Sequence, residues 1–202
     1  KIKKIIYASS SSVYGDKKKF PLNEKNSASP KNIYSLSKKN NEEIAEIYSK
    51  YYKIKFIGLR FFTIYGEWGR PDMLILKYIL STRNKKVFYL NNFGNHFRDF
   101  TYISDAVKIM ITLIKKNFKN KNELFNISSN NPVSIKWILK ILKNEFGSTL
   151  IKKRSRQRSE VYKTHGSNLK VIKVTNFKKF TNISVGLTNV IKWAKKNIHY
   201  IK

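Results

Sequence analysis

The sequence of 202 residues contains no cysteine. This absence excludes a disulfide scaffold, a thiolate metal site and cysteine catalysis, and it leaves the redox compartment open. Long apolar runs are also missing, because the longest ones, such as residues 73–76, are far too short to span a bilayer. The three histidines, His96, His165 and His199, lack the spacing of metal ligands, and we interpret them as ordinary surface residues. We therefore expect a soluble, cytoplasmic protein with no membrane partner and no bound metal.

Acidic residues are scarce: 12 Asp and Glu stand against 42 Lys and Arg, which gives a net charge of +30 at pH 7. Such a charge is typical of nucleic-acid binding, but it also results from a general lysine bias on the surface of an ordinary enzyme. Lysines are scattered through nearly every segment, and only residues 152–158 (KKRSRQR) form a dense basic block. We favour the surface bias and expect no specific nucleic-acid partner, although a phosphorylated or polyanionic ligand fits either interpretation.

Apolar residues are frequent enough for a folded core, since 41% of the chain is hydrophobic and 14% is aromatic. The apolar patterns predict strands at residues 2–7, 54–59, 87–90, 100–103 and 124–127, and helices at 33–52, 73–80, 104–116, 134–147 and 184–198. Ser104 and Ser134 stand where N-caps are expected, with Asp105 in the first turn of its helix. Residues 17–31 are predicted to form a surface loop, and residues 161–180 are ambiguous. Strands that alternate with helices predict an α/β fold with parallel strands.

One pair of residues, a tyrosine and a lysine, indicates a possible catalytic function. Tyr34 and Lys38 are four residues apart, on one face of the first turns of a predicted helix. A free phenol, with a pKa of about 10, is a poor base at neutral pH, but a nearby ammonium group stabilises the phenolate. In a chain rich in tyrosine and lysine, such pairs also arise by chance and lie in solvent. The strand before the helix ends in the serine run 9–12, which would open into the crevice where α/β sheets bind ligands. A serine, a tyrosine and a lysine that meet there would form a proton relay suited to alcohol and carbonyl chemistry.

Five motifs follow one another in a distinctive order. They are YASSSSVYG at 7–15, the Tyr34/Lys38 pair, GLRFFTIYGEWGRPDM at 58–73, RDFTYI at 98–103 and FNISSNNPV at 125–133. Together they resemble the extended short-chain dehydrogenase/reductases that act as NAD-dependent sugar-nucleotide epimerases and dehydratases, and within that group the UDP-glucuronate 4-epimerases. The resemblance implies an α/β fold: the C-terminal part of a doubly wound, parallel, Rossmann-like sheet, interleaved with a small α/β substrate domain. It further implies that residues 1–65 and 97–130 belong to the NAD-binding domain, and residues 66–96 and 131–202 to the substrate domain.

The resemblance also implies NAD as the cofactor, a UDP-sugar as the substrate, and roles for individual residues. Tyr34 matches the catalytic base that takes a proton from the sugar 4-hydroxyl while hydride passes to NAD. Lys38 matches the lysine that holds the nicotinamide ribose and favours the phenolate of Tyr34. Ser10 matches the residue that hydrogen-bonds the reacting oxygen. Ser9 and Phe61 join Tyr34 and Lys38 among the expected cofactor contacts.

Other positions match substrate contacts of the family. Ser11 and Ser12 stand where dehydratases carry an Asp–Glu pair, which argues against dehydration and leaves small donors for a sugar carboxylate. Thr63 matches a substrate-contacting residue. Arg70 matches an arginine near the substrate, where its planar fork suits a carboxylate or a phosphate, although it could also be a surface charge beside Trp68.

Arg98 matches the arginine that binds the phosphates of the nucleotide. It could instead merely pair with Asp99, but we favour the phosphates. Toward the C-terminus, Arg158, Ser159 and Glu160 replace a Pro-Gly-Asp turn of the family, and Ser167 replaces an aspartate. These changes weaken any statement about uridine contacts beyond residue 152.

The glycine-rich turn of the family is absent, since the eight glycines form neither GxxGxxG nor GxGxxG. The chain begins near the strand that bears the catalytic serine, so we expect it to cover roughly the C-terminal two-thirds of a family member. A fragmentary sequence, a split protein with a separate N-terminal half and a decayed gene product are the three explanations. Relatives pair as homodimers through the helix that starts at Tyr34, so a second copy is another candidate partner.

We therefore predict an epimerase that acts at C4 of a UDP-sugar, converting UDP-glucuronate to UDP-galacturonate through a 4-keto intermediate, and that is inactive as the isolated fragment. Two alternatives remain open. One is a non-catalytic basic remnant that binds anionic polymers. The other is a related UDP-sugar reductase or dehydratase.

Overall fold

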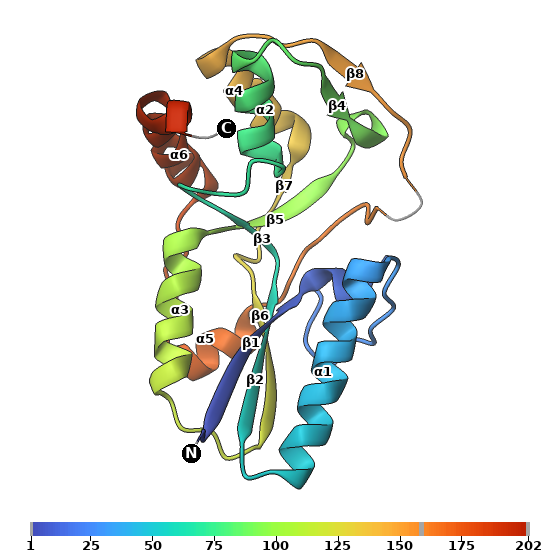
Figure 1. Ribbon diagram of the computed structural model, residues 1–202, viewed down its shortest axis with the longest axis vertical. Coiled ribbons are helices and arrows are strands. Elements are labelled where there is room, and N and C mark those ends of the chain that lie inside the picture. The colour runs from blue at the N-terminus through green and yellow to red at the C-terminus, as the bar shows by residue number, and fades with distance from the viewer. Residues whose placement is uncertain (1, 158–159, 201–202) are drawn as a thin grey trace.

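The strands in the described part of the chain, residues 2–157 and 160–200, form a parallel core sheet and two smaller sheets beyond it in this computed structural model (Figure 1). In the core sheet the order is β1 (Lys4–Ser10), β2 (Lys55–Phe61) and β6 (Asn122–Ile127), and both pairs are parallel. The register aligns Ser10 with Phe61 and Phe61 with Ile127. The carboxyl ends of the three strands therefore meet at one edge, which is where open α/β sheets bind ligands.

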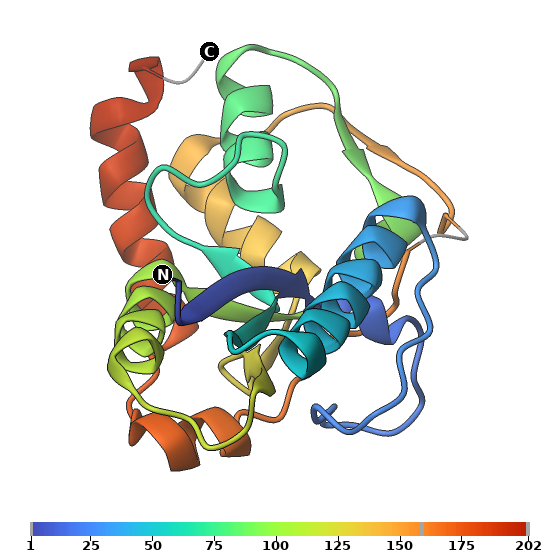
Figure 2. The same cartoon turned by 60° about the horizontal axis from the view of Figure 1, so that its bottom comes forward.

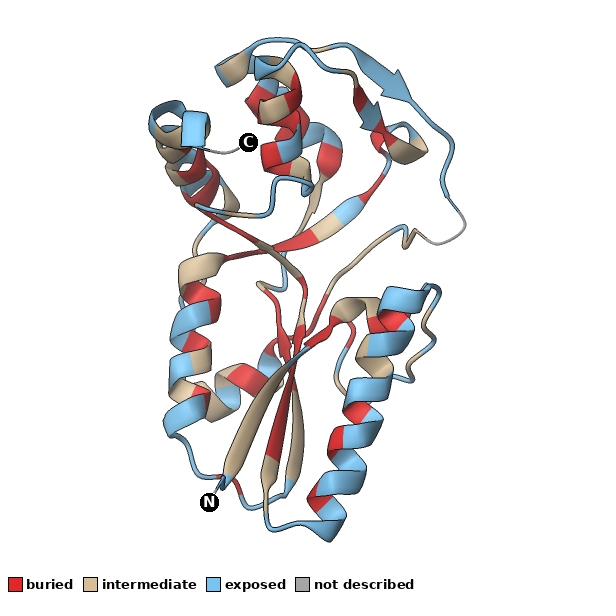
Figure 3. Cartoon of the chain, in the orientation of Figure 1, coloured by how far each residue is buried: buried red, intermediate tan, exposed pale blue. Residues whose placement is uncertain are grey.

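Helices cover both faces of the core sheet. α1 (Ile33–Tyr51) lies against one face, whereas α3 (Ile103–Lys115) and α5 (Leu169–Thr175) lie against the other (Figures 1 and 2). Because both faces are covered, β2 is buried along most of its length (Figure 3). This is the parallel α/β arrangement that the sequence predicts.

The core between the sheet and its α3 side is apolar. Ile57 and Leu59 of β2 pack with Ile109 of α3 and Val171 of α5, and all four are almost completely buried. Burying each such side chain stabilises the fold by roughly 1.5–3 kcal/mol. The sequence-based division places residues 131–202 in the substrate domain, yet α5, within that range, packs into the core of the strand-rich lobe. The division into domains stays a prediction in other respects.

α1 buries a few small or polar residues against the protein and leaves its large apolar residues exposed. Its buried residues are Ser35, Glu42, Ala45 and Ser49. Its exposed large apolar residues include Ile33, Leu36, Ile44, Ile47, Tyr48 and Tyr51. The apolar spacing that predicts the helix therefore marks a face that no described part of the chain covers.

The second lobe is mainly helical. Its elements are β3 (Thr63–Tyr65), α2 (Leu74–Arg83), β4 (Phe88–Leu90), β5 (Phe97–Tyr102), β7 (Pro132–Ser134), α4 (Ile135–Phe146), β8 (Ile151–Lys153) and α6 (Ile183–Asn197). β5 pairs parallel with β3 and antiparallel with β7, and β4 pairs parallel with β8. The buried sides of α2, α4 and α6 share one apolar core, which Figure 3 shows in red. None of the helices in the described residues is long and apolar enough to cross a membrane.

Several local expectations differ from the structure. α3 begins at Ile103 rather than after Ser104, and Asp105 accepts hydrogen bonds from the amide (2.6 Å) and the hydroxyl (3.0 Å) of Thr181. Ser134 occupies the N-cap position of α4, but its side chain makes no capping hydrogen bond. The loop at residues 17–31 is not wholly on the surface, because Leu22 is buried and pairs with the segment at Gly166. These differences arise because tertiary contacts outweigh the local signal.

Candidate active site

A cavity of about 400 Å³ lies at the carboxyl ends of β1 and β2. Its lining includes all ten site residues that the sequence predicts: Ser9, Ser10, Ser11, Ser12, Tyr34, Lys38, Phe61, Thr63, Arg70 and Arg98. These residues come from β1, the turn after it, α1, β2, β3, the loop after β3, and β5. The fold therefore gathers separate sequence motifs around one space, and the individual roles stay predictions.

The start of α1 fixes Tyr34 and Lys38. Asn32 and Ser35 form a capping box, in which Asn32 Oδ1 accepts from the Ser35 amide (2.8 Å) and Ser35 Oγ accepts from the Asn32 amide (3.1 Å). Lys38 Nζ donates to the carbonyl of Ala8 (3.1 Å) and lies 5.8 Å from the centre of the Tyr34 ring. Lys38 thus joins the helix to the end of β1, beside a phenol that is 55% exposed.

The serine run turns sharply into the cavity wall. Ser10 is the N-cap of the short 3-10 helix η1 (Ser11–Tyr14), and its Oγ accepts from the amide (3.1 Å) and the hydroxyl (2.9 Å) of Ser12. Because Ser10 Oγ accepts both bonds, its own hydrogen remains available for another oxygen. Ser9 differs, because its hydroxyl is buried and donates to Glu42 Oε1 (2.6 Å). Any contact of Ser9 with a cofactor would therefore involve its backbone rather than its hydroxyl.

A buried ion pair lies behind the serine run. Glu42 of α1 accepts two hydrogen bonds from Arg60 of β2, from Nε to Oε1 and from Nη2 to Oε2, both 2.8 Å long. The side chains are only 3% and 4% exposed. Burial is the largest single effect on Arg60 and opposes its charge, but the hydrogen bonds and charges of Glu42 and Tyr14 together outweigh burial and raise the pKa of the guanidinium. Glu42 is not among the residues that the sequence predicts for the site, although its position four residues after Lys38 places it on the same helix face.

Arg98 is a half-buried cation in the cavity wall. Its Nη1 donates to the carbonyls of Phe97 and Tyr162, both at 2.9 Å, and its Nη2 donates to the carbonyl of Val161 at 2.7 Å. Burial lowers the pKa of Arg98 to about 10, so the side chain stays charged at neutral pH. No carboxylate in the described residues lies within ion-pair distance of it. Glu160 and Asp16 act on this charge only from a longer range, so the guanidinium has no direct carboxylate partner and suits an anion.

The alternative pairing of Arg98 with Asp99 is wrong. Asp99 is fully buried, and its carboxylate accepts from the Ser129 amide, the Ser129 hydroxyl and the Gly166 amide at 2.9–3.0 Å. Asp99 therefore ties together the loops that carry Ser129 and Gly166, and it leaves Arg98 facing the cavity.

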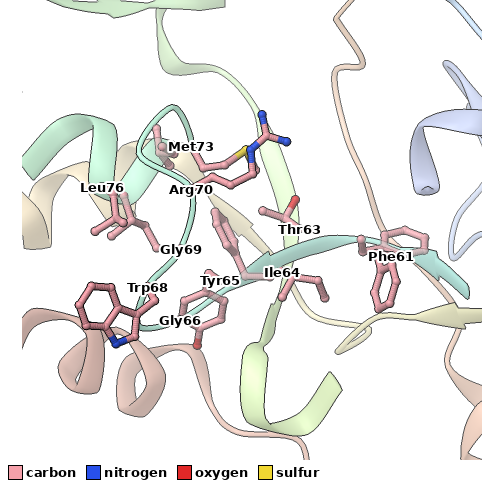
Figure 4. Close-up of a pocket in the computed structure, with 14 residues that line it drawn as sticks. Phe61, Thr63, Ile64, Tyr65, Gly66, Trp68, Gly69, Arg70, Met73 and Leu76 are labelled. Carbon is pink, nitrogen blue, oxygen red and sulfur yellow. The ribbon is translucent and has the colours of Figure 1, made fainter. Parts of the chain in front are cut away.

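Arg70 lies on the exposed loop between β3 and α2. Its Nε donates to Asp72 Oδ1 (3.0 Å) and its Nη2 to Asp72 Oδ2 (2.6 Å). Arg70 also lines a second, mainly apolar cavity of about 440 Å³, which shares Phe61, Thr63 and Met73 with the first. Figure 4 shows Arg70 and Met73 beside Thr63, with Trp68 at the far end of this second cavity.

Some cavity residues escaped the sequence analysis. Val161 and Thr164 line the cavity from the stretch that was ambiguous, because the pairing of Phe97 with Lys163 brings this stretch beside β5. No local periodicity could have revealed this long-range contact. His96 was expected on the surface, but it is 6% exposed, and its Nε2 has no hydrogen-bond partner in the described residues. The described residues contain no cluster of histidine, aspartate and glutamate side chains that could hold a metal ion.

Comparison with known proteins identifies the family. Residues 1–128 match the sequence model described as the NAD dependent epimerase/dehydratase family. The chain belongs to this family. Similar members of the NAD-dependent epimerase/dehydratase family include an uncharacterized protein, MJ1055, of Methanocaldococcus jannaschii, 38% identical over 97% of this chain and 60% of that protein. UDP-glucuronate 4-epimerase 4 of Arabidopsis thaliana is 34% identical over 94% of this chain and 47% of that protein.

Solved structures of epimerases show the same fold. A UDP-glucuronic acid 4-epimerase from Bacillus cereus, in complex with UDP-glucuronic acid and NAD, has a TM-score of 0.88 and 27% sequence identity. The match covers 97% of this chain and 62% of that chain. The present member of the epimerase/dehydratase family therefore spans between 47% and 62% of the length of these proteins, and their fold is Rossmann-like.

Proposed function

We propose that this chain carries the catalytic and substrate-binding part of an NAD-dependent UDP-sugar 4-epimerase that converts UDP-glucuronate to UDP-galacturonate. The observation that carries the proposal is the position of Ser10, Tyr34 and Lys38 in the wall of one cavity that also contains two arginines. Similarity to UDP-glucuronate 4-epimerases of plants and of Bacillus cereus supports this choice of substrate.

The residues around the cavity fit the nicotinamide end of NAD. Lys38 uses its ammonium for the Ala8 carbonyl, and an ammonium carries three donors, so two remain for ribose hydroxyls. Phe61 lines both cavities and offers an apolar surface for a ring. The sequence has no glycine-rich turn, so the adenosine and pyrophosphate need a further part of the protein. When bound, NAD supplies the site that accepts and returns a hydride.

The chain's own residues would handle the proton. Tyr34, whose ring centre lies 5.8 Å from Lys38 Nζ, takes the proton from the sugar 4-hydroxyl and returns it after the 4-keto sugar has turned over. Ser10 donates its free hydrogen to the same oxygen and keeps it oriented. These roles are consistent with the lining of the cavity, to which β1 contributes Ser10 and α1 contributes Tyr34 and Lys38.

The anionic parts of the substrate would bind to the arginines. Arg98 would balance its buried charge against the diphosphate, because charge-assisted bonds are strongest where water is excluded. Ser11, Ser12, Thr63 and Arg70 would surround the sugar, with Arg70 available for the carboxylate. The outer face of α1, which is apolar and uncovered, would bind a second copy of the chain or the further part of the protein.

The proposal is tested with this chain joined to an upstream glycine-rich half from a full-length relative. Supplied with NAD and UDP-glucuronate, the joined protein should form UDP-galacturonate, which chromatography of the products detects. Tyr34→Phe should lower kcat by roughly 10²–10⁴-fold, as expected for loss of a general base. Ser37→Ala, three residues further along the same helix and exposed, is the control. Failure to interconvert the two UDP-sugars would remove this substrate assignment.

A second candidate function is the binding of anionic polymers. It is favoured by the basic block at residues 152–158, which begins in β8. All three residues of β8 are exposed, and the Arg154 guanidinium lies 3.6 Å from the centre of the Tyr89 ring. Arg158, at the end of the basic block, lies outside the described residues. Salt-dependent retention on heparin without any UDP-sugar binding would favour this function over the epimerase.

A further inference from the structure

Asp72 is hydrogen-bonded to Arg70, the residue proposed to bind the carboxylate of the substrate. Both carboxylate oxygens of Asp72 accept from the fork of Arg70, at 3.0 Å from Nε and 2.6 Å from Nη2. A bidentate contact of this kind is also the geometry in which an arginine recognises the carboxylate of a ligand. Arg70 therefore cannot bind Asp72 and a sugar carboxylate through the same two donors at once.

The position of Arg70 makes this competition relevant to the site. Arg70 lines the same cavity as Tyr34, and the hydrogen bond to Asp72 is the main reason that its pKa is raised. The guanidinium lies beside Thr63 in Figure 4. A carboxylate on a sugar that fills this cavity would reach the same guanidinium.

The ion pair between Arg70 and Asp72 can separate at little cost in free energy. The Arg70 and Asp72 side chains are 73% and 61% exposed, so water solvates both partners when they separate. Exposed ion pairs contribute little stability for this reason. The buried pair of Glu42 and Arg60 differs, because separating it would leave two charges without water.

We propose that Asp72 is a specificity-determining residue of this site: its carboxylate competes with the carboxylate of an acidic sugar for Arg70 and so limits the preference for acidic over neutral UDP-sugars. This inference rests on the proposed function. An acidic sugar gains the Nε and Nη2 donors of Arg70 only by displacing Asp72, and at the remaining donors it meets a guanidinium whose charge Asp72 already neutralises. A neutral sugar binds with the pair intact. Asp72 therefore weakens the binding of the acidic sugar selectively, which also lets an acidic product leave.

The test compares binding of UDP-glucuronate and UDP-glucose to the 202-residue chain by calorimetry at constant, low ionic strength. Asp72→Asn should tighten binding of UDP-glucuronate by roughly 2–5-fold, the range expected for an exposed ion pair, and leave UDP-glucose unchanged. Arg70→Ala should abolish the preference for UDP-glucuronate. In the double variant, Asp72→Asn should have no further effect, because the two residues act as one unit.

A matched control separates this effect from general electrostatics. Glu145→Gln removes one negative charge from an exposed ion pair of similar length, in which Lys195 Nζ lies 2.7 Å from Glu145, and neither residue lines the two cavities around Arg70. It should leave the ratio of the two affinities unchanged. An equal change for both sugars in Asp72→Asn, or a weaker preference for UDP-glucuronate, would overturn the inference.

The outcomes also separate the inference from the proposed function. If the wild-type chain prefers UDP-glucuronate through Arg70 but Asp72→Asn leaves the ratio unchanged, the role of Asp72 is wrong and the proposed function stands. If the wild-type chain binds neither UDP-sugar, the role of Asp72 is wrong, and the joined protein decides the proposed function separately. An NMR signal of the Arg70 Nε–H that is protected from exchange, and that Asp72→Asn abolishes, would show the ion pair in solution. Lack of such protection would count against the inference alone.

Discussion

Glu42 and Arg60 form a bidentate ion pair that joins α1 to the centre of the core sheet. Glu42 lies on the same face of α1 as Tyr34 and Lys38, and it also accepts the hydroxyl of Ser9. The residue after Ser9 is Ser10, the expected donor to the reacting oxygen. One carboxylate thus connects the helix that carries the tyrosine to the strand that carries the serine.

Glu42→Gln should destabilise the chain by about 3–5 kcal/mol, because it leaves the buried guanidinium of Arg60 without a charged partner. Urea denaturation followed by circular dichroism measures this loss. Glu43→Gln is the control, because Glu43 forms an exposed pair with Lys39 on the same helix and should have an effect within about 0.5 kcal/mol.

The double variant Glu42→Met/Arg60→Met distinguishes charge from packing. Apolar side chains of similar volume often replace a buried ion pair without loss of stability, so we expect the double variant to be more stable than Glu42→Gln. The double variant also loses the hydrogen bond from Ser9 to Glu42 and the one from Arg60 to the Glu24 carbonyl. If it is less stable than Glu42→Gln, these two hydrogen bonds contribute more to stability than the unpaired charge costs.

Arg98→Met should weaken binding of UDP by at least 10-fold and leave binding of uridine nearly unchanged. The reason is that the charge of Arg98 has no carboxylate partner in the described residues and is available to the diphosphate. Calorimetry with UDP and with uridine measures both effects. An equal loss for both ligands would indicate a general disturbance of the cavity and would contradict phosphate binding by Arg98.

Much of the fold follows from local patterns in the sequence. The strands at β1, β2 and β6 and the helices α1, α3 and α4 coincide with predicted apolar segments within a few residues. The orientation of α1 does not follow from its sequence pattern, because helical spacing shows which residues share a face but not which face is buried. Here the polar face is buried, since Glu42 finds Arg60 on a strand that follows the helix. This pairing is a tertiary contact that periodicity does not encode.

The residues of the candidate site also fall into two groups, those that the sequence predicts and those that only the structure reveals. Motif order was enough to name ten residues that the structure gathers around one cavity. Thr164 and Val161 could not be named, because they reach the cavity through contacts with β5. Asp72 was quoted within a motif, but only the structure shows that it occupies Arg70. Residue type and spacing therefore predict which groups meet, whereas their hydrogen-bond partners need the fold.

The outer face of α1 should mediate association. Ile44 and Tyr48 are about half exposed, at 55% and 49%, and they lie one helical turn apart on the apolar face. Because large uncovered apolar patches mark interaction sites, the double variant Ile44→Glu/Tyr48→Glu should shift the chain toward the monomer. Sedimentation velocity at several concentrations measures this shift.

The matched control for association replaces exposed apolar residues elsewhere. Ile111 and Ile114 of α3 are 47% and 53% exposed, and glutamates there should leave the α1-mediated association unchanged. Wild-type chain that is monomeric at every concentration tested would contradict self-association through α1. The face would then remain as the binding surface for a further part of the protein.

His96 should make the stability of the chain depend on pH. Burial lowers the pKa of His96, and the charge of Arg98 lowers it further, with a smaller contribution of the same sign from Arg156 and an opposing one from Glu160. The unfolded chain, with an ordinary histidine pKa of about 6.5, therefore binds a proton more readily than the folded chain. The contribution of neutral His96 to the free energy of unfolding is therefore fully present above the unfolded pKa. It is lost as the pH falls from there through the lower pKa of His96 in the folded chain.

The measurement is the urea midpoint at pH 7.5 and pH 5.5. Between these values the wild-type chain should lose more stability than His96→Phe, because phenylalanine fills the same space and cannot take up a proton. His165, whose pKa burial also lowers, contributes in the same direction, so the comparison is made within otherwise identical chains. His199→Phe, at an exposed position near the C-terminus, should keep the pH dependence of the wild type. Equal slopes for the wild type and His96→Phe would show that His96 exchanges its proton as freely in the folded chain as in the unfolded one, despite its burial beside Arg98.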